Sequence, residues 1–113
     1  MDDMKESLGL LFGAMIESKV ALAAASESEL EAREDLKSSE AVIINSTDPK
    51  ALGANEAARN ATIRARTQTE RMALERAENA KRDAALRYEL DCMAVDCLKW
   101  QIRADLAAKG MVI

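Results

Sequence analysis

The sequence predicts an all-α fold, a long antiparallel helical hairpin of the coiled-coil type that dimerises into a four-helix bundle. The 113 residues are rich in alanine, leucine, glutamate, arginine and lysine, with one proline and four glycines. Apolar residues recur at alternating spacings of three and four in both halves. We expect one domain, with helix 1 over about 3–45, a corner at 46–54 and helix 2 over about 55–109.

The first half carries one continuous apolar seam. Its positions are Met4, Leu8, Leu11, Met15, Ser18, Leu22, Ala25, Glu29, Ala32, Leu36, Ser39 and Ile43. Nine of these twelve positions are apolar, so the pattern is typical of a helix that packs along one face. A second apolar face appears only near the start of the chain. It consists of Leu10, Phe12, Ile16 and Val20.

The stretch around the single proline has the composition of a turn between two helices. Asp48 precedes Pro49, which is the order of a helix cap and a favoured first-turn residue. We expect the short helical turn to stop at Gly53 and the next helix to be capped by Asn55, with Glu56 in its first turn. A phosphate-binding loop would need several glycines and a Lys-Ser/Thr pair after a strand, which this stretch lacks.

The second half repeats the seam and contains no proline or glycine before Gly110. Its seam positions are Ile63, Thr67, Glu70, Leu74, Ala77, Lys81, Ala84, Tyr88, Asp91, Val95, Leu98 and Ile102. A second stripe accompanies the seam toward the end of this helix. It consists of Leu86, Leu90, Met93, Cys97 and Trp100. Gly110 fits the position just past the helix end.

A short connection makes the two helices antiparallel neighbours. If the corner is centred near residue 50, the numbers of facing residues sum to about 100. Residues 26–40 hold six acids and two bases, whereas residues 60–74 hold three arginines and one glutamate. This register therefore places opposite charges across the hairpin, although each exposed pair contributes only about 0.2–1 kcal/mol.

The open end of this hairpin carries more apolar side chains than two helices can cover, which is typical of an interaction site. A two-fold dimer would cover them. The predicted interface consists of Leu8, Leu11, Phe12, Met15, Leu90, Met93, Leu98, Trp100, Ile102 and Leu106. Gly9 and Gly13 would allow two helices to approach closely there, or would relieve crowding within a packed core.

The composition argues against catalysis. The sequence has no histidine, which removes the commonest general base and metal ligand. We therefore expect no catalytic residue, no cofactor and no metal site. The two cysteines, Cys92 and Cys97, lie five positions apart on a helix and cannot bridge each other. They are expected to be buried free thiols in a reducing cytoplasm.

The net charge of −4 does not favour nucleic acid or an anionic membrane as a partner. Arginine and lysine nevertheless outnumber acids over residues 57–88, so the alternative is a nucleic-acid-associated coiled coil that uses the basic face of helix 2. The apolar run Leu8–Ile16 is too short for a membrane span, which leaves only a peripheral membrane role for it.

Residues 52–59, Leu-Gly-Ala-Asn-Glu-Ala-Ala-Arg, resemble the L-G-x-N-E-x-x-R element of small helical proteins from bacteriophages and prophages. The resemblance implies a phage-encoded accessory protein in the host bacterial cytoplasm, acting in phage replication or on a host system. No catalytic or binding residue carries over. The partner would be an unidentified protein as well as a second copy. The candidate partner-binding residues are Asn55, Glu56, Arg59, Arg64, Arg66 and Arg71; Asn55, Glu56 and Arg59 are alternatively helix-capping residues.

Overall fold

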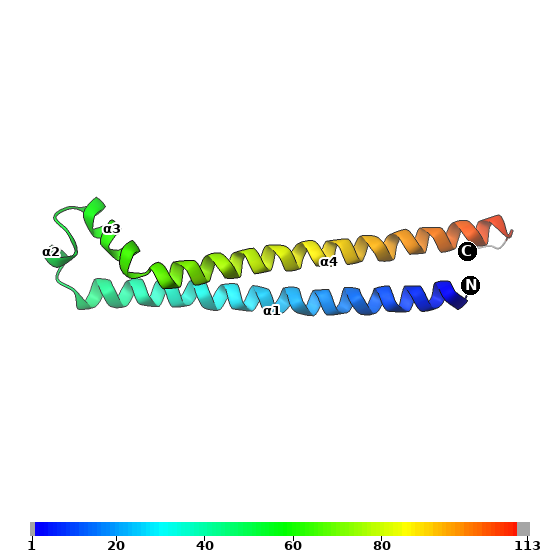
Figure 1. Cartoon of the computed structure of the whole chain (residues 1–113), viewed down its shortest axis with the longest axis horizontal. Coiled ribbons are helices and arrows are strands. Elements are labelled where there is room, and N and C mark those ends of the chain that lie inside the picture. Colours follow the sequence, from blue (N-terminus) through cyan, green and yellow to red (C-terminus); the bar gives the residue numbers. More distant parts are fainter. Residues whose placement is uncertain (1, 111–113) are drawn as a thin grey trace. The chain divides into compact units, whose positions relative to one another are not determined.

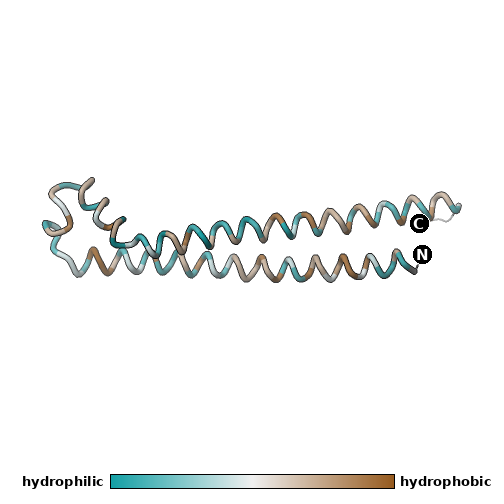
Figure 2. The backbone as a smooth tube through the Cα atoms, in the orientation of Figure 1, coloured by the Kyte–Doolittle hydropathy of each residue, from teal (hydrophilic) through white to brown (hydrophobic). Residues whose placement is uncertain are grey.

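The computed structural model describes residues 2–110, and every regular element in that range is a helix (Figure 1). Helix α1 spans Asp2–Ser46, α2 spans Pro49–Leu52, α3 spans Glu56–Arg66 and α4 spans Gln68–Ala108. The predicted all-α class is confirmed, and the arrangement agrees with a helical hairpin. Apolar positions recur along both long helices (Figure 2).

The described chain forms two compact units. The central unit, residues 25–81, contains the second half of α1, the corner helices α2 and α3, and the beginning of α4. The terminal unit comprises residues 2–24 and 82–110, which are the first part of α1 and most of α4. In each unit, a segment of α1 faces a segment of α4.

The predicted seam is the side on which the helices bury their residues. All twelve seam positions of α1 are buried or half-buried, and so are eleven of the twelve positions in the second half, Lys81 being the exception. Few side chains are closed off from solvent, however. Among the described residues the buried ones are Ser18, Leu52, Thr67 and Val95. Each unit therefore has a narrow core, as expected for two helices in contact along one stripe.

A charged layer interrupts the seam of the central unit. Glu29 lies at a seam position of α1, and its carboxylate is 3.1 Å from the Nζ of Lys81 on α4. Arg33 lies one turn from Glu29 and contacts its carboxylate at 2.6 Å, and Arg33 also lies 3.5 Å from Glu78. The polar residues that weaken the seam pattern thus meet one another, which fixes one register of the two helices.

The register differs from the predicted one. Three cross-helix contacts of the central unit join Glu29 with Lys81, Ser39 with Glu70, and Glu40 with Arg71. Their residue numbers sum to 109–111 instead of about 100. The turn between the paired helices is therefore centred near residue 55, because α2 and α3 both belong to the connection and α3 is not the first part of a continuous second helix.

The second half is broken at Thr67, where neither proline nor glycine gives a signal. Thr67 is fully buried and has φ −107° and ψ 20°. Its hydroxyl donates to the backbone oxygen of Ile63 at 2.8 Å and accepts from the Nε of Arg71 at 3.1 Å. Back-bonding of this kind bends helices, so the threonine side chain explains why α3 ends and α4 begins here.

The capping roles predicted for the corner are confirmed. The side chain of Asp48 accepts a hydrogen bond from the backbone N–H of Lys50, and Pro49 is the first residue of α2. The side chain of Asn55 accepts from the backbone N–H of Ala58 at 2.8 Å, at the start of α3. Each of the two short helices therefore has one of its N-terminal donors satisfied by the side chain of its cap residue.

We expect acid to weaken the central unit through Glu29. Hydrogen bonds from Arg33 and then Lys81 hold the pKa of this carboxyl below its ordinary value of 4.5. Because the folded pKa is the lower one, the contribution is present above the ordinary pKa and is lost as pH falls through the folded value. Circular dichroism should show a lower Tm for E29Q than for wild type at neutral pH, and a much smaller difference at strongly acidic pH.

A charge exchange provides the control for this contact. E29K places two cations at the seam and should lower Tm further than E29Q, whereas E29K/K81E should recover part of that loss. An equal decrease in Tm for E29K and for E29K/K81E would show that Glu29 and Lys81 do not interact across the hairpin.

Candidate interaction surfaces

An outward apolar stripe runs along α4 in the terminal unit. Its large residues are exposed: Leu86 by 56%, Leu90 by 52%, Met93 by 57% and Trp100 by 68%. Cys97, between Met93 and Trp100, is also exposed. The stripe is offset from the seam by two residues, which places it about 160° around the helix from the seam. These side chains therefore point away from α1.

The first part of α1 has an outward apolar face as well. Leu10, Ile16 and Val20 are exposed by 76%, 60% and 65%. Gly9 and Gly13 also lie in open space, with no atom within 4 Å of a Cβ placed on either one. The explanation that these glycines relieve crowding inside the chain's own core is therefore wrong.

The ten predicted interface residues fall into two groups. Leu90, Met93 and Trp100 belong to the outward stripe of α4. The others are half-buried in the terminal unit, where α1 and α4 take up much of their surface; they are Leu8, Leu11, Phe12, Met15, Leu98, Ile102 and Leu106. Because half-burial leaves part of each of these side chains exposed, the predicted interface stays a prediction. It did not include Leu86, whose spacing matches the outward stripe.

Cationic side chains cover the aromatic rings of the terminal unit. The Nζ of Lys99 lies 5.2 Å from the centre of the Phe12 ring, so Phe12 faces α4 and does not continue the outward face of α1. The guanidinium of Arg103 lies 5.2 Å from the ring of Trp100 on the same helix. Such contacts contribute about 0.5–1 kcal/mol at exposed sites, and at Trp100 the ring remains largely accessible.

The cysteines are free thiols, but the expectation that both are buried is wrong. Cys92 is half-buried and Cys97 is exposed. A hydrogen bond with Cys92 raises the pKa of Tyr88, one turn earlier on α4. The five-residue spacing correctly excluded a bridge between the two cysteines, and the exposure of Cys97 agrees with its predicted place in the second stripe of this helix.

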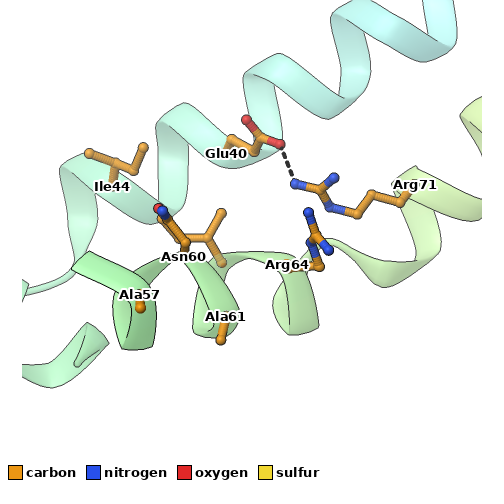
Figure 3. Close-up of a pocket in the computed structure, with 8 residues that line it drawn as sticks. Glu40, Ile44, Ala57, Asn60, Ala61, Arg64 and Arg71 are labelled. Atoms are coloured by element: carbon orange, nitrogen blue, oxygen red, sulfur yellow. Dashed lines mark hydrogen bonds and ion pairs between the residues drawn. The ribbon is translucent and has the colours of Figure 1, made fainter. Parts of the chain in front are cut away.

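The central unit contains a partly charged pocket of about 490 Å³ beside the corner (Figure 3). Its charged walls are Glu40 from α1, Arg64 from α3 and Arg71 from α4, and Glu40 and Arg71 form an ion pair at 2.9 Å. Arg64 extends into the same space (Figure 3). The remaining lining residues are Ile44, Ala57, Asn60, Ala61 and Ile63.

The predicted partner-binding residues are only partly brought together. Asn55 caps α3, and the Nε of Arg59 donates to its backbone oxygen at 3.3 Å, so both have roles within the fold. Glu56 lies exposed in the first turn of α3, and Arg66 lies exposed in its last turn. Arg64 and Arg71 share the pocket, an association that depends on the unpredicted break between α3 and α4.

Charge opposition across the hairpin is present in the central unit with different partners from those predicted. Of the three arginines expected to face the acidic stretch of α1, Arg71 forms a cross-helix ion pair, while Arg64 and Arg66 lie exposed on α3.

The described residues contain no group of three or more potential metal ligands.

No known protein family, curated protein or solved structure matches this chain. Its function must therefore be inferred from the surfaces described above.

One helix in the described part of the chain, Asp3–Ser46, is long and apolar enough to cross a membrane. Its best 18-residue window has a mean hydropathy of 1.6 and is 6% buried. The uninterrupted apolar run Leu8–Ile16 is too short to span by itself, but over 18 residues the helix is apolar on average although charged residues interrupt it. This test concerns length and composition only, so the expectation of no membrane span stays a prediction.

Proposed function

We propose that this chain is a non-enzymatic binding protein whose terminal unit self-associates, forming a homodimer with a four-helix bundle at the interface. The observation that supports it is the outward stripe of α4, where four large apolar side chains are each more than half exposed. In the terminal unit, by contrast, Val95 is the one apolar residue buried in the described core. A helix with two apolar faces needs partners on both sides.

The proposal also concerns the biological setting. The element at residues 52–59 resembles part of small phage proteins, and we infer a phage-type accessory role in the bacterial cytoplasm. In that role the protein would bind a further protein and modulate a host system or assist phage replication. The corner of the central unit, with its charged pocket, is the surface we assign to that second partner.

Self-association is tested by replacing Leu90 with glutamate. L90E introduces a charge into the interface twice in a two-fold dimer, and losing an anchor of about 2 kcal/mol on each side raises Kd by about a thousandfold. Sedimentation equilibrium should therefore find wild type as a dimer and L90E as a monomer at the same micromolar concentration.

The matched control is L30E, because Leu30 is a similarly exposed leucine of α1 in the central unit, with 57% of its surface accessible. L30E should remain dimeric. A wild-type chain that sediments as a monomer at the highest concentration tested would refute self-association.

Nucleic acid is the alternative partner. Residues 48–71 carry five basic and three acidic side chains, and Arg64 and Arg66 are exposed there. Binding of this kind is strongest at low salt. Titration of duplex DNA and single-stranded RNA at low salt separates the two functions, because the binding-protein proposal predicts no association and the alternative predicts association that R64E/R66E abolishes.

Membrane association is the remaining candidate, favoured by the exposed apolar window of α1. Flotation with vesicles of neutral and anionic lipids tests it directly. Self-association predicts that the protein stays with the soluble fraction at concentrations where it is dimeric, whereas a membrane function predicts that it floats and that V20E prevents flotation.

A further inference from the structure

The outward stripe of α4 has the spacing of a second coiled-coil seam. Leu86, Leu90, Met93, Cys97 and Trp100 follow one another at intervals of four, three, four and three. Ala104 continues the pattern. A strict alternation of this kind presents knobs to another long helix, so the missing partner of this face is a helix of comparable length.

The outward face of α1 does not have this regularity. Leu10, Ile16 and Val20 are separated by six and four residues, and Glu17 lies within the same stretch. It therefore lacks the repeat that a long helical partner would need. The stripe of α4 is the better-formed second seam of the terminal unit.

The stripe is complementary to itself when two copies of α4 run antiparallel and the two-fold axis crosses them at the level of Val95 along the helix. The Val95 side chain itself stays on the seam, facing α1. Leu86 then meets Ala104, Leu90 meets Trp100, and Met93 meets Cys97 of the second copy, with each pairing occurring twice. Large residues face smaller ones at either end and around the axis. Every large side chain of the stripe thus finds an apolar partner.

The flanking charges favour this register over the one that brings Leu86 opposite Cys97. With Val95 at the axis, Glu89 of each copy lies beside Arg103 of the other, which gives two opposite-charge contacts at the rim. A shift of one heptad that brings Leu86 opposite Cys97 instead places Arg82 beside Arg103 and Glu89 beside Asp96, and these are like-charge pairs. The opposite shift, which brings Trp100 opposite Cys97, would place Asp96 beside Arg103 but leaves Leu86 with no stripe residue opposite it. The register at Val95 also brings the two Asp96 side chains near each other, which is its one unfavourable contact.

A parallel arrangement is disfavoured by the same positions. In a parallel pair, a rim residue of one copy contacts the residue of the other copy whose number is higher by five. Arg82 of one copy would then lie beside Arg87 of the other, and Glu89 would face Ala94. The parallel pair therefore offers a repulsive contact and no attractive one among these residues.

We propose that two copies of this chain associate through the outward stripe of α4, antiparallel, with Met93 of one copy against Cys97 of the other. This inference rests on the proposed self-association and specifies the surface, orientation and register. Because the stripe lies opposite the seam, the four helices of the proposed bundle lie side by side in one layer, in the order α1 and α4 of one copy followed by α4 and α1 of the second.

The native Cys97 makes the register testable by cross-linking. M93C should form a disulfide-linked dimer under mild oxidation, because positions 93 and 97 face each other across the axis. L86C and W100C pair with Cys97 in registers shifted by one heptad in either direction, and both should cross-link more slowly than M93C. M93C/C97A should give no cross-link and serves as the matched control.

A charge exchange tests the same register without cysteines. E89R and R103E should each raise the dimer Kd at least several-fold, and E89R/R103E should return it toward the wild-type value. D96N should lower Kd, because it removes the one like-charge contact at the axis. Sedimentation velocity across a dilution series gives all four values.

The outcomes separate this inference from the proposed function. A wild-type dimer in which L86C or W100C cross-links faster than M93C, or in which E89R/R103E shows no recovery, overturns the assigned register while self-association stands. A wild-type dimer unaffected by L90E overturns the assigned surface. A monomeric wild type overturns both proposals.

Discussion

Replacing Val95 with aspartate is expected to unfold the terminal unit at neutral pH. Val95 is 2% exposed and lies on the seam of α4. No seam position of the terminal unit holds a cation that could pair with a carboxylate there, and an uncompensated buried charge costs about 3–5 kcal/mol. Because small proteins are stable by only about 5–15 kcal/mol, V95D should lose much of its helical circular dichroism or melt at a much lower temperature.

The matched control is V20D, in the same unit. Val20 is 65% exposed on the outer face of α1, so the new carboxylate remains hydrated and the change should stay within the small range typical of surface substitutions. Hydrogen exchange localises the effect: V95D should lose amide protection first in residues 2–24 and 82–110.

Acid offers a second readout of the same variant. The buried aspartate has a raised pKa because desolvation disfavours its charged form, so protonation relieves part of the penalty and V95D should regain helicity as pH falls. V20D should show no such recovery. Similar melting temperatures for V95D and V20D would mean that Val95 is not in a closed core.

The seam was predictable because it depends on one local regularity. The alternation of three and four places residues such as Leu22 and Ala77 on one face whatever the partner helix is, and the structure half-buries both. The outward stripe of α4 was predictable for the same reason. The spacing did not predict which apolar residues the hairpin itself would cover, because coverage depends on the neighbouring helix.

The register could not be obtained in the same way. It depends on where the second long helix begins, and that point is set by Thr67, a residue whose effect on a helix varies with its side-chain hydrogen bonds. Without a proline or glycine at the break, α3 and α4 look like one helix in the sequence. The predicted sum of facing residue numbers was therefore too low by about ten. As a result, neither the contact of Glu29 with Lys81 nor the pocket shared by Arg64 and Arg71 was predicted.

Replacing Gly53 with alanine is expected to open the corner of the central unit. A Cβ on Gly53 would lie 2.8 Å from the backbone carbon of Ala58, from its Cβ and from the backbone nitrogen of Arg59. All three atoms belong to the first turn of α3 and two of them are backbone atoms, so relief requires α3 to move away from α2. Overpacking of this kind costs about 1–3 kcal/mol.

The effect should be local to the corner. G53A should lower Tm and should weaken protection of the amides of α3 before those of α4 between Gln68 and Lys81. Thermal melting followed by circular dichroism gives the first quantity, and hydrogen exchange gives the second. Unchanged protection in α3 would show that α2 and α3 do not pack as closely as the 2.8 Å contacts require.

Two other glycines provide controls for the crowding at Gly53, since both lie in open space. Gly110 has φ 76° with open space around it, so G110A meets only the left-handed backbone penalty of about 1–2 kcal/mol. Gly13 is helical and open, so G13A should stabilise α1 by about 1 kcal/mol. If copies pair through α4, the face of α1 that carries Gly13 stays uncovered, and G13A raises Tm without changing the dimer Kd. A G13A variant that melts higher but dissociates more readily would instead place the second copy against α1.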